Sequence, residues 1–102
     1  LMNQGVGFVE VFGFVTAIKA ADAAAKAADV KIVALDKNKP ANAEKLPVPL
    51  IMIVKIRGSV ADVEAAMNAA EVAAKNLTGV VSRHIIPNPT EDTEKLLKLS
   101  AI

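Results

Sequence analysis

The residues that could do chemistry are few. The 102-residue sequence contains a single histidine, His84, and no cysteine. Disulfides, thiolate metal sites and cysteine nucleophiles are therefore excluded. His84 stands between Arg83 and Ile85, and no Ser, Cys or paired carboxylate is placed to act with it. We therefore interpret His84 as a half-buried strand residue with a satisfied hydrogen bond, in preference to a general acid or base.

Other common functional sites are also missing. No set of His, Cys or carboxylate residues has the spacing of metal ligands. The acids Glu91, Asp92 and Glu94 are better explained as charge at the start of a helix. The segment 5–7 precedes a strand and so does not resemble a phosphate-binding loop. Residues 50–54 lack the aromatics of an RNA-binding sheet, and the net charge is only +1. We expect no enzyme activity, cofactor, metal, nucleic-acid partner or membrane partner.

One long polar segment, residues 36–49, interrupts an otherwise apolar sequence. It contains charged residues of both signs: Asp36, Lys37, Lys39, Glu44 and Lys45. Apolar segments 30–35 and 50–57 flank it and read as strands. Because loops of this length in compact domains tend to be functional or disordered, we predict a loop with a role. A solvated surface loop without a role is the alternative that these residues leave open.

The periodicity predicts an α+β domain. Strands are predicted over 7–12, 30–35, 50–57 and 80–86. Alanine-rich helices are predicted over 15–28 and 60–76, with a short terminal helix after Thr90. The order βαββαβ predicts a ferredoxin-like fold, with a four-stranded antiparallel sheet and two helices on one face. The chain length predicts one domain, residues 1–102.

Three local contacts follow from spacing. Asp22 and Lys26 are placed for an i,i+4 ion pair on the first helix. Ser59 and Asp62 are placed to cap the second helix. Gly79 is free to take a left-handed conformation where that helix ends.

The chain carries more apolar surface than its own elements require. Hydrophobic residues make up 53% of the sequence, and the apolar side of the first helix is wider than one sheet contact needs. The strands are also too apolar to leave the second face of the sheet in water. We therefore predict that another subunit, or the terminal helix, covers this surface. With no secretory signal and no apolar segment of membrane-spanning length, we expect a cytosolic protein.

Residues 7–97 resemble the shell proteins of bacterial microcompartments, in the form with a single BMC domain. The matching segments occur in the family's order and spacing: residues 7–10 with Gly13, 17–23 with Lys26, 55–60, 65–74 and 84–89. The resemblance implies a structural building block without catalytic activity, located in a microcompartment shell in the cytoplasm. Such proteins form cyclic homohexamers that tile with other shell proteins around encapsulated enzymes.

The same resemblance implies a pore on the sixfold axis for small metabolites, lined by the loop between the second and third strands. It assigns five pore residues: Asp36, Lys37, Asn38, Lys39 and Pro40. The family's short glycine-rich turn is replaced here by the longer proline-containing segment 36–49. Because sixfold symmetry multiplies each side chain, rings of Lys37 or Lys39 would favour anionic metabolites. A folded-over loop would instead narrow or plug the opening.

The resemblance also assigns contacts between hexamers. Lys26 falls at the position of the family's edge lysine. Asp29 stands where Asn is common, and Asn88 stands where Arg is common. Arg83 or Lys75 is the candidate to replace the missing arginine.

Two other functions remain alternatives from the fold pattern. A trimeric PII-like regulatory domain also has a long loop between the second and third strands, but it needs glycine and basic residues at its clefts that we do not find. A small acylphosphatase-like enzyme needs an arginine and a phosphate-binding loop after the first strand, and residues 13–15 carry no charge.

Overall fold

The computed structural model describes residues 4–38 and 51–90. In chain order the elements are β1 (Gln4–Phe12), α1 (Phe14–Ala27), β2 (Val30–Asn38), β3 (Ile51–Ser59), α2 (Val60–Lys75) and β4 (Val80–Pro87). The predicted βαββαβ order is confirmed. The predicted terminal helix lies outside the described residues.

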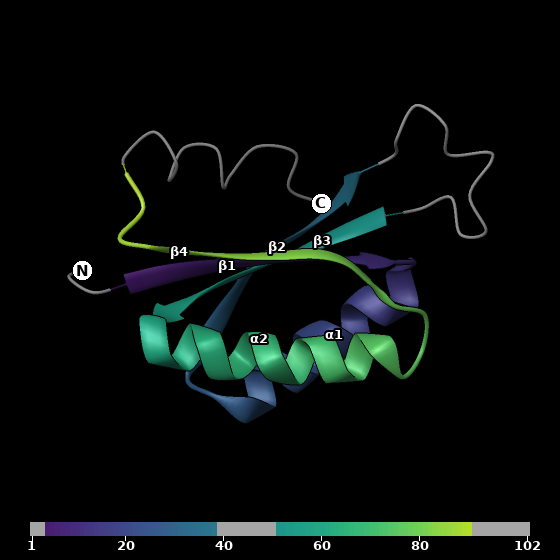
Figure 1. Cartoon of the computed structure of the whole chain (residues 1–102), viewed down its shortest axis with the longest axis horizontal. Helices are drawn as coiled ribbons and strands as arrows, with labels where there is room; N and C mark the ends of the chain where they lie inside the picture. Colours follow the sequence, from purple (N-terminus) through teal and green to yellow (C-terminus); the bar gives the residue numbers. More distant parts are fainter. Residues whose placement is uncertain (1–3, 39–50, 91–102) are drawn as a thin grey trace.

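The four strands form one antiparallel sheet in the order β2-β3-β1-β4. Both helices lie on the same side of this sheet (Figure 1). We call the side that contacts α1 and α2 the helix face, and the opposite side the open face. This is the ferredoxin-like arrangement that the sequence predicted.

The core lies between the helix face and the two helices, and its residues are mostly small. Its fully buried members include Val9 and Val11 of β1, Met52, Val54 and Ile56 of β3, Ala17, Ala20 and Ala24 of α1, and Val63, Ala66, Met67, Ala70 and Ala74 of α2. Alanine on the helices allows a close approach to the sheet. An added Cβ at Gly7 would lie 2.8 Å from Met67 Sδ and 2.9 Å from Val63 Cγ1, so α2 passes too close to β1 for a side chain there.

The open face also carries buried apolar residues, whereas the predicted cover, another subunit or the terminal helix, lies outside the described residues. By strand register, this face carries Val6 of β1 and Ile51 of β3, which are 0% and 8% exposed. It carries charged and polar groups as well, which are described below.

Several predicted boundaries need correction. β2 continues to Asn38, so residues 36–38 belong to a strand and not to the predicted loop. The reason is that Asp36 pairs with Lys55 and continues the ladder with β3. β1 begins at Gln4, and β4 includes Pro87, which is tolerated because β4 is an edge strand. Both helices agree with prediction within one residue at each end.

The predicted local contacts are confirmed. The N–H of Asp62 donates to Ser59 Oγ at 3.1 Å, and the Ser59 hydroxyl donates to Asp62 Oδ2 at 2.9 Å. Asp22 and Lys26 form their ion pair at 2.8 Å. Gly79 has a φ of 149°, on the side that glycine favours. Across residues 4–38 and 51–90, no helix has the length and apolar character needed to span a membrane.

Candidate pore and edge sites

The described pore residues lie at one end of the sheet. Phe12, Ile51 and Asn38 are cross-strand neighbours where β1 ends, β3 begins and β2 ends. We call this the loop end, because residues 39–50 connect β2 to β3 there. Lys39 and Pro40 belong to that connection and lie outside the described residues. The loop end therefore places three of the five predicted pore residues together.

Asp36 is buried on the open face, 2% exposed, and forms an ion pair with Lys55, which is 6% exposed. One carboxylate oxygen, Oδ1, has no hydrogen-bond partner in the structure as described. The carboxylate of Asp36 therefore contacts β3 inside the chain. Its charge is compensated locally, and it does not project into solvent.

Lys37 differs from the preceding residue, Asp36, in its exposure to solvent. It pairs with Met52 in the ladder, which places it on the helix-face side of β2, and its side chain is exposed. Lys37 is therefore an exposed cation on the strand ends that form the loop end.

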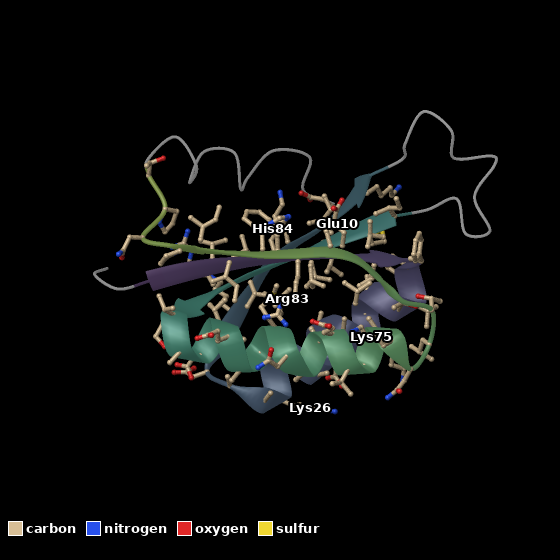
Figure 2. The ribbon with its side chains drawn as sticks, viewed as in Figure 1. Glu10, Lys26, Lys75, Arg83 and His84 are labelled. Carbon is tan, nitrogen blue, oxygen red and sulfur yellow. The ribbon has the colours of Figure 1, made fainter. Side chains whose placement is uncertain are left out.

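Further polar groups lie on the open face near this ion pair. The Ser82 hydroxyl of β4 donates to Glu10 Oε1 of β1. His84 lies on the same face of β4, opposite Phe8 in the register (Figure 2). His84 is exposed and not half-buried as predicted, because β4 is an edge strand and the helices lie on the other face.

Three of the predicted edge residues, Lys26, Asp29 and Asn88, lie toward the opposite end of the sheet, which we call the far end. Val30, Gly58, Gly5 and Pro87 form one row of cross-strand neighbours there. Asp29 immediately precedes this row and Asn88 immediately follows it. Lys26 lies nearby, in the last turn of α1. The structure thus separates the edge residues from the loop end by the length of the strands.

Asn88 has a backbone reason to be asparagine. Its φ of 53° is left-handed, a conformation that asparagine adopts more readily than most residues with a side chain. Lys26, in contrast, is 76% exposed and held by Asp22 of its own helix.

Arg83 and Lys75 do not reach the far end. Arg83 projects from the middle of β4 toward α2 (Figure 2), where its Nη1 donates to Glu71 Oε1 at 2.8 Å and to Asn68 Oδ1 at 3.0 Å. Lys75 contacts Glu71 Oε2 at 2.6 Å. The hydrogen bond from Lys75, followed by that from Arg83, lowers the pKa of Glu71 below its usual 4.5. Both cations that were candidates to replace the missing edge arginine are therefore engaged by Glu71.

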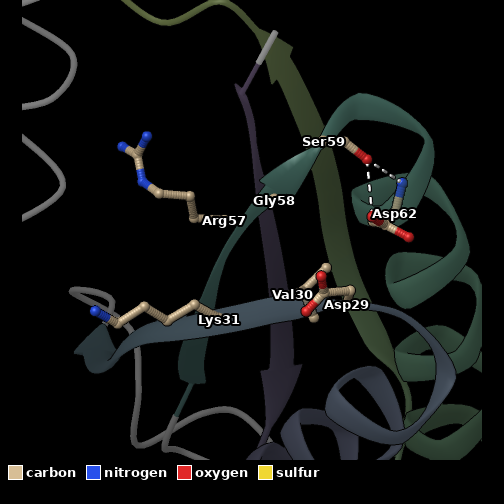
Figure 3. A pocket seen from close by; sticks show the side chains of 7 residues that line it. All are labelled: Asp29, Val30, Lys31, Arg57, Gly58, Ser59 and Asp62. Carbon is tan, nitrogen blue, oxygen red and sulfur yellow. Dashed lines mark hydrogen bonds between the residues drawn. The ribbon is translucent and has the colours of Figure 1, made fainter. Parts of the chain in front are cut away.

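A shallow cavity of about 550 Å³ opens at the far end (Figure 3). Its lining residues are Asp29, Val30, Lys31, Arg57, Gly58, Ser59 and Asp62. Lys31 and Arg57 extend to one side of the strands, whereas Asp29 and Asp62 lie on the side of the helices. Ser59 and Asp62 are already used in the helix cap. Within residues 4–38 and 51–90, no cluster of three or more potential metal ligands occurs.

Sequence reasoning missed Lys55 and Glu71 as interaction centres. Lys55 lies within the apolar segment 50–57, which the sequence predicts to be a strand. A lysine within a strand that is expected to be buried requires an opposite charge, and that requirement was the available signal. For Glu71 on α2, no local pattern indicates that Arg83 of β4 would reach it.

The BMC domain family model matches residues 5–89. The chain belongs to the BMC domain family. The bacterial microcompartment shell protein PduA of Citrobacter freundii is 37% identical over 97 residues, which cover 95% of both chains. The carboxysome shell protein CcmK3 of Halothece is 33% identical over 101 residues, 97% of this chain and 90% of the other.

A third similar protein is the microcompartment shell protein EutM of Salmonella typhimurium, 33% identical over 97 residues, which cover 95% of this chain and 92% of EutM. A solved microcompartment protein from Desulfitobacterium hafniense has the same fold, with a TM-score of 0.72 and 27% identity. The match covers all of this chain and half of that one. The BMC domain relatives are structural shell proteins, which supports a structural and not a catalytic role here. Family membership also decides against the PII-like and acylphosphatase-like alternatives.

Proposed function

We propose that this BMC domain chain is a structural subunit of a bacterial microcompartment shell and forms cyclic homohexamers. In the proposed ring, the loop end faces the sixfold axis and the far end faces outward. The observation that supports the proposal is that the candidate pore residues 36–38 lie at one end of the sheet, and the candidate edge residues Asp29 and Asn88 adjoin the other end. With nine residues in β3, these ends are separated by roughly 26 Å. One orientation of the subunit in the ring would therefore place the candidate pore residues at the axis and the candidate edge residues at the rim.

Exposed apolar side chains support ring formation. They are Phe14, Val15 and Ile18 on α1, Val72 and Leu77 on or just beyond α2, and Val81 on β4. Exposed large apolar side chains on a small domain are candidates for protein–protein contacts. This is the surplus apolar surface that the sequence predicted. In the proposed hexamer it is buried between neighbouring subunits.

The charge at the loop end supports a preference for small anionic metabolites. Lys37 is exposed there, and sixfold symmetry would place six copies around the axis. Asp36 does not offset this charge, because its carboxylate pairs with Lys55. Passage through the pore would serve enzymes that the shell encloses.

At the far end, we propose that hexamers contact each other, and other shell proteins, through Lys26. Asn88 supplies no cation, and Arg83 and Lys75 are engaged by Glu71. The variant Lys26→Asp should therefore abolish assembly of hexamers into sheets while leaving the hexamers intact. Negative-stain electron microscopy of sheets, together with native mass spectrometry, checks both statements. Sheets that form unchanged would show that Lys26 has no edge role.

Native mass spectrometry also tests the proposed ring itself. We expect a homohexamer whose stability does not depend on nucleotide. A trimer stabilised by nucleotide would contradict the proposed function.

A further inference from the structure

β2 changes the face on which its side chains lie partway along its length. The register shifts between Ile32 and Ala34, so that Val33 is an extra residue without a partner in the ladder. Before this bulge, Ile32 is opposite Ile56 on the helix face. After it, Leu35 is opposite Val54 on the helix face and Asp36 lies on the open face. A one-residue bulge of this kind inverts the alternation of every residue that follows.

The same segment has a second possible register, without the bulge. In that register Ala34 would face Val54, and Asp36 would face Met52, which is fully buried in the core. Burying a carboxylate there without a partner would be strongly unfavourable. Lys37 would move from the helix-face side to the open face. β2 is an edge strand and pairs with β3 alone within the described sheet. Leu35 packs against the core in the observed register, and this contact also favours that register.

Asp36 has a specific partner only in the observed register. Lys55 is opposite Ala34, and Asp36 is opposite Ile53, so the two side chains are diagonal neighbours on the open face. Their ion pair is almost completely buried. Buried ion pairs add little net stability compared with apolar residues, but they can select one register over another.

We propose that the Asp36–Lys55 pair is a positioning pair, which holds β2 in the bulged register and thereby places Lys37 on the helix-face side of the loop end. The effect of this pair on a pore rests on the proposed function, because only a hexameric ring would place six copies of Lys37 around one axis. The register itself is a property of one chain. The known family resemblance does not assign this role to either residue.

The test measures the register of the full-length chain by NMR, from cross-strand contacts of the backbone. In the parent protein, Val54 should show cross-strand contacts with Leu35 and none with Ala34. The double variant Asp36→Val/Lys55→Met removes both buried charges of the described residues, and positions 35 and 36 are then both apolar. We expect a second set of amide signals for residues 33–37, with contacts between Ala34 and Val54.

Two variants serve as controls. The exchanged pair, Asp36→Lys/Lys55→Asp, should restore a single bulged register. Lys31→Met removes a lysine from the same face of β2, on the far side of the bulge, and should leave the register unchanged. A single bulged register in Asp36→Val/Lys55→Met would overturn the proposal, as would a mixed register in Lys31→Met.

A second readout follows the position of Lys37 directly. Since the chain has no cysteine, Lys37→Cys introduces one reactive thiol. We expect its labelling rate to change at least about threefold when Asp36→Val/Lys55→Met is added, and to return with the exchanged pair. An unchanged rate would contradict the proposal. Native mass spectrometry of the same samples separates this outcome from a failure to form hexamers, which would affect the proposed function alone.

Discussion

The two faces of the sheet are built from different chemistry. The helix face is apolar and closely packed, with Gly7 allowing α2 to pass over β1. The open face combines apolar side chains with buried or half-buried charges, chief among them Asp36 and Lys55. Apolar packing tolerates many sequences of similar volume, whereas a buried ion pair requires one particular partner. The comparison indicates that the helix face specifies the fold and the open face specifies the register of β2.

The largest expected effect comes from breaking the ion pair on the open face. Lys55→Met should lower the free energy of unfolding by about 3–5 kcal/mol, because it leaves the Asp36 carboxylate buried and unpaired. Asp36→Val/Lys55→Met should recover most of this loss, since no buried charge remains. Urea unfolding followed by circular dichroism measures both values. A loss below about 1 kcal/mol in Lys55→Met would show that the pair is not buried as described.

The next effect tests the close packing of the helix face. Gly7→Ala should destabilise the protein by about 1–3 kcal/mol, because the new Cβ would overlap Val63 and Met67. Gly5→Ala is the matched control, since its nearest atom is Val60 Cγ2 at 3.3 Å. We expect Gly5→Ala to cost less in the same unfolding experiment. Equal losses for the two variants would contradict the proposed close approach of α2 at Gly7.

A smaller effect is expected at the helix cap, away from both faces. Ser59→Ala removes the acceptor of the Asp62 N–H and should lower stability by about 1 kcal/mol. Ser59→Asp keeps an acceptor at this position and is expected to retain most of the stability. Thermal unfolding of the two variants gives the comparison, and equal melting temperatures would exclude a capping role.

The smallest expected effect concerns Glu71. Its pKa is lowered by Lys75 and Arg83, so its ionised form is favoured in the folded state. The resulting stability should be fully present above the unfolded-state pKa, near 4.5, and should be lost as pH falls through the lower folded-state pKa. The difference in stability between the parent and Glu71→Gln should therefore shrink below about pH 4.5. A difference that grows on acidification would have the wrong sign.

Local patterns predicted most of the fold. Helix limits, the Ser59 cap and the Asp22–Lys26 pair depend on residues within one or two turns of each other, and spacing reveals them. The bulge in β2 was not predictable, because alternation alone would place Asp36 on the same face as Ile32. Its contact with Lys55, across 19 positions of chain, and the packing of Leu35 against the core distinguish the two registers. The Arg83–Glu71 contact was missed for the same reason, since it joins β4 to α2.

The position of the pore and edge residues was predicted from resemblance and not from local pattern. The structure adds that residues 36–38 and the pair Asp29 and Asn88 lie at opposite ends of the sheet, whereas Arg83 lies between these ends. Strand register places Asp29 and Asn88 beside the same end of the sheet, although 59 positions of sequence separate them. Their roles in a ring stay predictions until the ring is measured.

Distances between spin labels in the assembled protein test the central proposal most directly. Single labels attached at Lys37→Cys and at Asp29→Cys, in otherwise cysteine-free chains, report on the loop end and the far end. A hexamer with the loop end on its axis predicts shorter distances between labels within one ring at position 37 than at position 29. Shorter distances at position 29, or no distances between subunits at either position, would contradict the proposed shell subunit.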